Sequence, residues 1–229
     1  MNADLGRLLN EVGAVLLDFD GPVCSIFAGY PAPRVAAELV EVLYRRGIEV
    51  PPDLASEPDP LEVLRRIGAT GDQNATRAVE DALCAAERQA VETAEPTPYG
   101  REVIVAARQA GFPVAVVSNN SAGAVSAYLA AHRLAGHVSP VVGRAYAAPE
   151  RMKPNPEPIW QATHAVGEPP ARCVLIGDSR TDIDGARAAR VRVIGYANRP
   201  TKVEKFQAAG ADWVVTTMRE IADALVKRH

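Results

Sequence analysis

Acidic residues with short spacings stand at two places where the sequence changes from an apolar run to a turn. Asp18 and Asp20 lie two residues apart in the segment Asp18-Phe19-Asp20-Gly21. In extended backbone such side chains point to the same side, and two acids so close repel each other unless a cation lies between them or one holds a proton. This spacing permits one carboxylate to attack as a nucleophile while the other exchanges a proton with the leaving group and then with water.

The second acidic pair, Asp178 and Asp182, follows the predicted strand 172–176, which is apolar after Arg172, and its members are four residues apart. Carboxylate oxygens at a strand-to-helix turn suit a hard cation such as Mg²⁺. Water and phosphate oxygens would complete the octahedral coordination of the ion. Asp is also common in turns and at helix starts. Either acidic pair alone is therefore compatible with an ordinary turn.

Two further segments carry groups that recognise an anion. Ser118 and Asn119 follow the run 114–117 and precede a predicted helix, where a hydroxyl and backbone N–H groups form a natural anion pocket. Helix capping by Asn120 or Ser121 would explain the same residues. Lys153 stands beside a proline in a Pro-rich loop, which favours a fixed positive charge, although most lysines are simply solvated.

The elements that must position these residues alternate along the chain. Short apolar runs predict buried strands at 14–19, 113–118, 138–142, 172–177, 192–196 and 213–215. Helical periodicity lies between them, at 99–110, 122–132, 157–166, 181–190, 203–209 and 219–227. Such alternation predicts a parallel sheet with helices on both faces, the doubly wound, Rossmann-like α/β class. Sheets of this class bind ligands at the carboxyl ends of their strands, where the acids and Ser118 stand.

One stretch interrupts the alternation. Between residues 25 and 94 there is no convincing strand pattern, but apolar stripes of helical period are clear. Turn residues and prolines punctuate both ends of this stretch, and a Pro- and acid-rich segment at 50–60 predicts a loop inside it. We therefore predict an all-helical cap domain at 23–97, inserted into an α/β core domain that is made of residues 1–22 and 98–229.

Composition limits the classes of partner. The chain has 229 residues, of which 48% are apolar, enough for a sizeable core. With 25 basic and 28 acidic side chains it has no basic stripe, so we expect no nucleic-acid partner. The apolar runs are too short to span a bilayer and the first residues lack a signal-peptide core, so we expect no membrane association and a cytoplasmic location. The sequence leaves the oligomeric state open.

Taken in order, the motifs resemble those of the haloacid dehalogenase superfamily. Within it they are similar to phosphatases with a helical C1-type cap inserted after the first strand, the branch of the phosphoglycolate phosphatases and β-phosphoglucomutases. The matching segments span almost the whole chain: Asp18-Phe19-Asp20-Gly21, Ser118-Asn119, Lys153-Pro154, and Gly177-Asp178 with Asp182. Each falls at the strand end or in the loop that its motif requires.

The resemblance implies a Mg²⁺-dependent phosphatase that works through an aspartyl phosphate. It implies Asp18 as the nucleophile and Asp20 as the general acid and then base. Lys153 would neutralise charge between Asp18 and the phosphoryl group, and Ser118 with the N–H of Asn119 would bind phosphoryl oxygens. The metal would be held by Asp18, the backbone carbonyl of Asp20, Asp178 and Asp182, the last as a ligand or a support. Phosphoryl transfer depends mostly on alignment and on charge neutralisation at spread-out oxygens, which agrees with these roles.

Three alternatives within the family are weighed from the residues. Dehalogenases resemble this pattern but lack the second acid, so Asp20 disfavours carbon–halogen hydrolysis. A sugar-phosphate mutase keeps every motif and stays open. Pro22 stands where the family usually has Thr or Val, and proline lacks a backbone N–H. We expect a rigid substitute for the lost hydrogen bond, with a turnover-deficient binding or regulatory homologue as the remaining alternative.

The predicted cap carries five arginines that could meet an anionic substrate, although most would be solvated: Arg34, Arg45, Arg46, Arg65 and Arg66. The cap should close over the site and exclude water. A cap of this size favours a small phosphorylated metabolite over a phosphoprotein. Sugar phosphates and phosphoglycolate-like compounds are the candidates.

Overall fold

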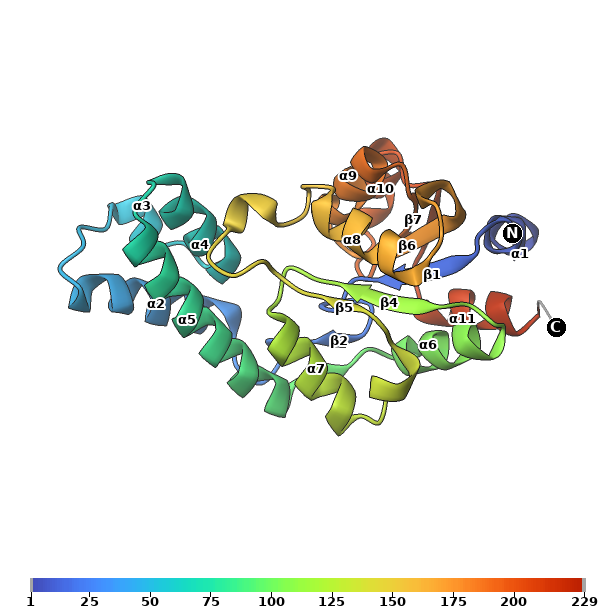
Figure 1. Ribbon diagram of the computed structural model, residues 1–229, viewed down its shortest axis with the longest axis horizontal. Helices are drawn as coiled ribbons and strands as arrows, with labels where there is room; N and C mark the ends of the chain where they lie inside the picture. Colours follow the sequence, from blue (N-terminus) through green and yellow to red (C-terminus); the bar gives the residue numbers. More distant parts are fainter. Residues whose placement is uncertain (1, 228–229) are drawn as a thin grey trace.

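A parallel sheet lies at the centre of the molecule (Figure 1). The computed structural model describes residues 2–227, so residues 1 and 228–229 of the predicted core domain lie outside it. The strands are β1 (Ala14–Leu17), β4 (Val114–Val117), β5 (Val141–Val142), β6 (Cys173–Gly177), β7 (Arg192–Tyr196) and β8 (Trp213–Val215). Their order is β5-β4-β1-β6-β7-β8, and all neighbours pair in parallel. The α/β class is confirmed, and a strand lies at each predicted position, although the one predicted at 138–142 is reduced to Val141–Val142.

The sheet separates two apolar cores because its strands are buried on both faces. Alternate residues of β1 divide between them: Val15 and Leu17 belong to one core, and Ala14 and Leu16 to the other. This is the side-chain period of two that extended backbone imposes. Near-continuous apolar runs of this kind are typical of central parallel strands with helices on each side.

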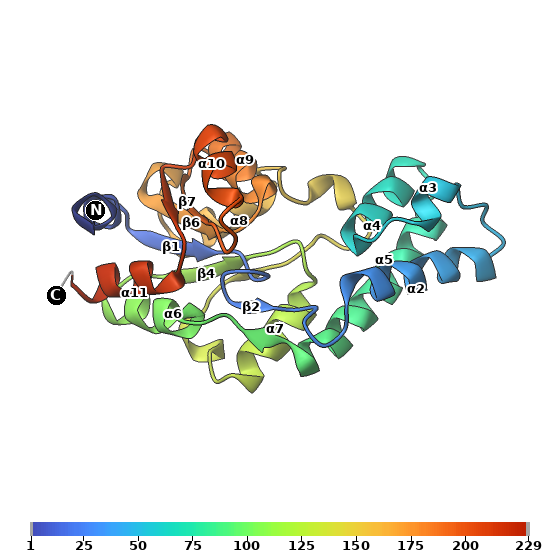
Figure 2. The ribbon, with the colours of Figure 1, turned by 180° about the vertical axis from the view of Figure 1, so that it is seen from behind.

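Helices cover both faces of the sheet (Figures 1 and 2). The helices are α1 (Asn2–Glu11), α6 (Gly100–Gln109), α7 (Ala122–Ala131), α8 (Glu157–Val166), α9 (Arg180–Ala189), α10 (Lys202–Ala208) and α11 (Met218–Val226). Helices α8, α9 and α10 contribute to the core on one face, and α1, α6, α7 and α11 to the core on the other. Among the described residues, no helix has the length and apolar character to cross a membrane.

A separate group of helices lies at the end of the molecule opposite the chain termini (Figures 1 and 2). It consists of α2 (Ala32–Arg45), α3 (Pro52–Ala55), α4 (Pro60–Ala69) and α5 (Gln73–Ala90). Asp59 and Asp72 cap the N-termini of α4 and α5 with their carboxylates, which satisfies backbone N–H groups that have no partner within the helix. We call these four helices the cap; its limits at 23 and 97 stay a prediction.

The cap segment differs from its sequence pattern in two details. Two-residue strands β2 (Cys24–Ser25) and β3 (Glu95–Pro96) pair antiparallel where the chain leaves and re-enters the core, so the segment is not entirely helical. Such short strands carry no periodicity by which a sequence could reveal them. The loop predicted at 50–60 contains the one-turn helix α3 and ends on the first residue of α4, because proline suits the first turn of a helix.

Candidate active site

The carboxyl ends of β1, β4 and β6 meet at the edge of the sheet that faces the cap. A pocket of about 540 Å³ lies there, between this edge and the cap. Its lining includes all but one of the residues predicted for the site, namely Asp18, Asp20, Ser118, Asn119, Lys153 and Asp178. Asp182, the exception, is completely buried in the first turn of α9.

Lys153 connects the acidic residues to one another. Its ammonium group lies 2.8 Å from Asp18 Oδ1 and 2.6 Å from Asp182 Oδ1, and it also donates to the carbonyl of Val117 at the end of β4. Burial lowers the pKa of Lys153, but Asp18 and Asp182 outweigh that effect and raise it to about 12. A fully buried ammonium group with these partners stays charged beside Asp18. The Pro-rich loop thus presents a fixed positive charge, as its sequence predicts.

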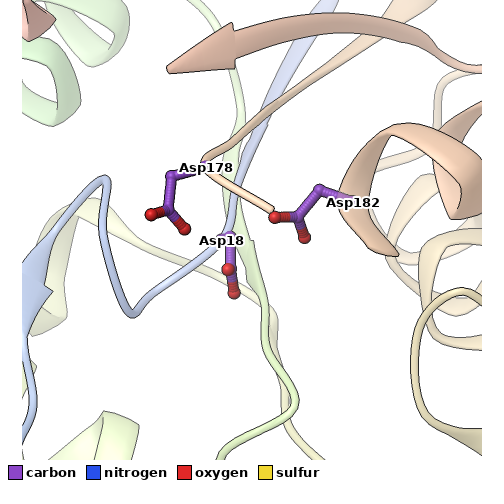
Figure 3. Close-up of side chains that lie close together, drawn as sticks. All are labelled: Asp18, Asp178 and Asp182. Carbon is purple, nitrogen blue, oxygen red and sulfur yellow. The ribbon is translucent and has the colours of Figure 1, made fainter. Parts of the chain in front are cut away.

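Three carboxylates point toward one another in the site (Figure 3). Oxygens of Asp18, Asp178 and Asp182 lie within 4.8 Å of one another. Burial raises the pKa of Asp18, Asp182 raises it further, and Lys153 opposes both. Burial also raises the pKa of Asp178. Burial is the largest cause of both shifts, and repulsion from neighbouring carboxylates adds to it.

The donor set fits a hard divalent cation. It consists of carboxylate oxygens, which suit Mg²⁺, and contains neither the thiolates nor the imidazoles that softer metals select. Within the described residues, four acids (Asp18, Asp20, Asp178 and Asp182) face two lysines (Lys153 and Lys202). A divalent cation would balance the remaining charge.

Asp20 is held by the turn that follows β1. Its Oδ1 accepts a hydrogen bond from the backbone N–H of Ile26 over 3.0 Å. Burial raises the pKa of Asp20 from 3.8 to about 6, against the lowering effect of that bond. A carboxyl group with a pKa near neutrality can both give and take a proton, which general acid–base catalysis requires.

Gly21 lets this turn approach Asp178. Its φ is +108°, a conformation that L side chains rarely adopt, and a Cβ there would lie 2.3 Å from Cγ of Asp178. Other hydrogen bonds hold this turn in place of the one that Pro22 cannot donate. Gly21 N–H donates to the carbonyl of Cys24, and Thr97 Oγ1 donates to the carbonyl of Gly21. These bonds hold the turn although Pro22 has no N–H to donate.

The loop 118–121 after β4 presents the predicted anion-binding groups. Ser118 Oγ accepts from the backbone N–H of Asn120 over 3.1 Å. The side chain of Asn119 makes two hydrogen bonds to the backbone of Lys153. Asn119 Oδ1 accepts from the N–H of Lys153, and Asn119 Nδ2 donates to the carbonyl of Lys153. Ser121 stands at the N-cap position, just before α7, but makes no capping bond with its side chain. Helix capping by Ser121, the alternative reading of this segment, is therefore not observed.

Two residues of the site, Lys202 and Asn198, were not predicted from the sequence. Lys202, at the start of α10, contacts both the backbone carbonyl and the carboxylate of Asp178, and Asn198 donates to the same carboxylate over 2.9 Å. Neither belongs to a motif by which a single sequence would mark it. The place of Asn198 and Lys202 just beyond β7 is the available hint, since loops at the carboxyl ends of parallel strands face the ligand.

The arginines of the cap have different surroundings. Arg65 lines the pocket and donates to the backbone carbonyl of Lys153 over 3.2 Å. Arg34, Arg45 and Arg66 pair with nearby acids of the cap, and Arg65 also lies 3.5 Å from Glu62. Arg46 follows α2 on the exposed surface. Arg65 is thus the arginine of these five that lies beside the site.

The family follows from a comparison of sequences. The profile of the haloacid dehalogenase-like hydrolases matches residues 12–190, well over half of the chain. The chain therefore belongs to this family of hydrolases, as its motifs indicate. The matched region includes every residue predicted for the site.

Curated relatives include phosphatases of small metabolites by name. The chain is 29% identical over 133 residues to the phosphoglycolate phosphatase of Neisseria meningitidis, covering 57% of this chain and 56% of that protein. It is 26% identical over 132 residues to the phosphoglycolate phosphatase of Escherichia coli K12, covering 58% and 52%. The match thus spans about half the length of these relatives.

Solved structures share the fold along nearly the whole chain. A predicted phosphatase from Clostridium acetobutylicum superposes with a TM-score of 0.68 at 18% identity, covering 94% of this chain and 99% of that one. A putative β-phosphoglucomutase from Bacteroides vulgatus gives the same score and identity and covers 100% and 99%. At such identities the likeness establishes the fold and leaves the reaction open.

Proposed function

We propose that this protein is a Mg²⁺-dependent phosphatase that hydrolyses a small organic phosphate monoester through an aspartyl phosphate on Asp18. The observation that carries the proposal is the position of Lys153. Its buried ammonium group contacts Asp18 and lines a pocket shared with Ser118 and Asp178. Phosphoryl transfer needs a nucleophile and positive charge around one phosphate.

In the first half of the reaction, Asp18 attacks phosphorus. Within the described residues, the donors that contact Asp18, Lys153 and the N–H of Phe19, both reach Oδ1. Oδ2 is the oxygen left to form the new bond. As the bond from phosphorus to the ester oxygen breaks, Asp20 gives its proton to the departing alcohol. Ser118 and the N–H of Asn119 donate to the phosphoryl oxygens.

In the second half, water hydrolyses the aspartyl phosphate. Asp20, now a carboxylate, takes a proton from the attacking water, and the bond between phosphorus and Asp18 breaks. Inorganic phosphate leaves and both carboxylates return to their starting states. Asp18, Asp178 and the backbone carbonyl of Asp20 would hold Mg²⁺, which when bound supplies positive charge to the phosphoryl oxygens. Both oxygens of Asp182 already accept hydrogen bonds, which favours the supporting role for this residue.

The substrate class is narrowed by the cap. Residues 23–97 contribute Phe27, Pro33, Pro60 and Leu61 to the pocket lining, and Arg65 adds a cation. A small phosphate ester with a carboxylate would meet Arg65 at one end and Lys153 at the other. Phosphoglycolate, which gives two curated relatives their names, has this chemistry. The cysteines at 24, 84 and 173 are free, which supports the cytoplasm as the location.

A phosphomutase is the second candidate, because the fold of a putative β-phosphoglucomutase covers the whole chain. The hydrogen bonds that hold the turn at Pro22 count against the turnover-deficient alternative. The test is a panel of phosphoglycolate, sugar phosphates and an aryl phosphate, assayed with Mg²⁺ and with EDTA. Release of inorganic phosphate that requires Mg²⁺ supports the phosphatase. Conversion of one sugar phosphate into its isomer without net phosphate release supports the mutase.

A further inference from the structure

A buried cluster of charges joins the cap to the loop 118–121. Glu87, about one turn from the C-terminal end of cap helix α5, and Glu80, about two turns before Glu87, meet Arg144, which follows β5 in the core. The guanidinium lies 2.7 Å from Glu80 and 2.8 Å from Glu87, and all three side chains are at most 1% exposed. Buried charges of this kind are stable only when paired and hydrogen-bonded.

Glu87 and Arg144 hold the backbone and the amide side chain of the loop. Glu87 Oε2 accepts from the N–H of Ser121 over 2.9 Å, and Oε1 accepts from Nδ2 of Asn120 over 3.2 Å. Arg144 Nη1 donates to the carbonyl of Asn119 over 2.6 Å, and the backbone N–H of Arg144 donates to the carbonyl of Asn120. Consecutive peptide groups of the loop are thereby held by Glu87 and Arg144, neither of which is among the residues that line the pocket beside Asp18.

These contacts set the direction of Ser118. Because Glu87 takes the Nδ2 end of Asn120, the Oδ1 end faces Ser118 Oγ, at 3.2 Å. The N–H of Asn120 donates to the same hydroxyl oxygen. Ser118 Oγ therefore already accepts one bond, and its own hydrogen is left for Asn120 or for a phosphoryl oxygen in the pocket.

From these contacts we infer that Glu87 of the cap, together with Arg144, positions the phosphate-binding loop, so that the loop is complete only when α5 is docked. This inference rests on the proposed function, because it takes Ser118 and Asn119 as the groups that bind phosphate. Glu87 and Arg144 touch no reacting atom. They are positioning residues that act through the loop.

Glu80 provides a matched control. It is as buried as Glu87 and pairs with the same guanidinium, but its contacts are with Arg144 and Cys84 and not with the loop. In Glu87→Gln the new amide N–H₂ faces a donor in either orientation, because both carboxylate oxygens accept bonds from loop donors. Glu80→Gln keeps an oxygen toward the guanidinium.

The experiment measures the inhibition constant of inorganic phosphate, with an aryl phosphate as substrate at saturating Mg²⁺. Thermal stability and the Mg²⁺ activation constant are measured on the same proteins. We expect Glu87→Gln to raise the inhibition constant by about tenfold, the effect of losing one charge-assisted hydrogen bond, and Glu80→Gln to raise it by less than about threefold. The melting temperatures should fall by similar amounts, and the Mg²⁺ constants should stay at the wild-type value.

Equal effects of the two substitutions on phosphate inhibition would overturn the inference and leave the cluster a purely structural one. If Glu87→Gln does not fold, Asn120→Ala removes the side chain that links Glu87 to Ser118 Oγ and is measured in the same way. A threefold rise in its inhibition constant is expected, of the order of one ordinary hydrogen bond, and an unchanged constant would count against the inference. A wild-type protein that phosphate does not inhibit would refute the proposed function instead.

Discussion

The ammonium group of Lys153 lies 2.6 Å from Oδ1 of Asp182, and both side chains are almost completely buried. The other carboxylate oxygen, Oδ2, accepts bonds from the N–H and the hydroxyl of Ser179 at the start of α9. Asp182 therefore ties the lysine to the first turn of a helix that packs against the sheet. This arrangement explains how a lysine in a loop is held at a fixed distance from Asp18.

Removing Asp182 should destabilise the protein strongly, because it leaves the buried ammonium group with one carboxylate fewer. We expect Asp182→Ala to lower the free energy of unfolding by about 3–5 kcal/mol, the range for breaking a buried ion pair. Asp184→Ala on the same helix is the control, since the pair of Asp184 with Arg180 is exposed and is worth about 0.5 kcal/mol or less. Urea denaturation in Mg²⁺ measures both, and similar losses in the two variants would contradict this role.

Gly21→Ala should disable the site with little change to the rest of the fold. The new Cβ would collide with the carboxylate of Asp178 and push it out of the cluster. Displacements of about 1 Å cost on the order of a hundredfold in rate, so kcat/KM should fall by at least that factor. Gly47→Ala is the matched control, because Gly47 also has a positive φ but nothing lies near its Cβ. A wild-type value of kcat/KM in Gly21→Ala would argue against the close contact between this turn and Asp178.

The fold and most of the site follow from patterns that a single sequence contains. The runs 14–17 and 114–117 are apolar on every residue, as strands covered on both faces must be. Asp18, Ser118 and Asp178 stand directly after such runs, so their meeting at one sheet edge follows from the topology. The sequence also places Lys153 in a loop, but its contact with Asp182 depends on a buried geometry that spacing does not encode.

Other parts could not be predicted because their partners are distant in the chain. Arg144 contacts Glu80 and Glu87 across 64 and 57 residues, and no local pattern connects them. One signal was present: the two acids lie seven residues apart, at the edge of the apolar stripe of α5 that contains Val79 and Leu83. Acids in such a position need a buried cation, but a sequence does not say which one.

The charge of Asp20 should make the metal-free protein less stable as pH rises. Burial raises its pKa from 3.8 to about 6 in the folded protein, so the folded state holds a proton that the unfolded chain has lost. The stability that this bound proton gives to the folded state is fully present below pH 4 and is lost as pH rises through about 6. In EDTA, Asp20→Asn should gain up to about 3 kcal/mol over the wild type across this window. Denaturation of both proteins at several pH values measures the difference, and a difference independent of pH would refute the shift.

Arg65 should select for a second negative charge on the substrate. Arg65→Gln is expected to raise KM for phosphoglycolate by about tenfold or more, the effect of losing a hydrogen bond to a charged group. KM for an aryl phosphate whose aryl group carries no charge should stay near the wild-type value. Arg66→Gln is the control, because Arg66 pairs with Asp53 within the cap and should change neither constant. Equal effects of Arg65→Gln on both substrates would contradict the proposal that Arg65 binds a carboxylate of the substrate.

The central claim is that Asp18 carries the phosphoryl group between the substrate and water. The most direct measurement is mass spectrometry of peptides from enzyme quenched in acid during turnover of an aryl phosphate. We predict a phosphoryl adduct on the peptide that contains Asp18, longer-lived in Asp20→Asn because that variant lacks the base for hydrolysis, and absent from Asp18→Asn. An adduct on another residue, or sustained turnover by Asp18→Asn, would contradict the account.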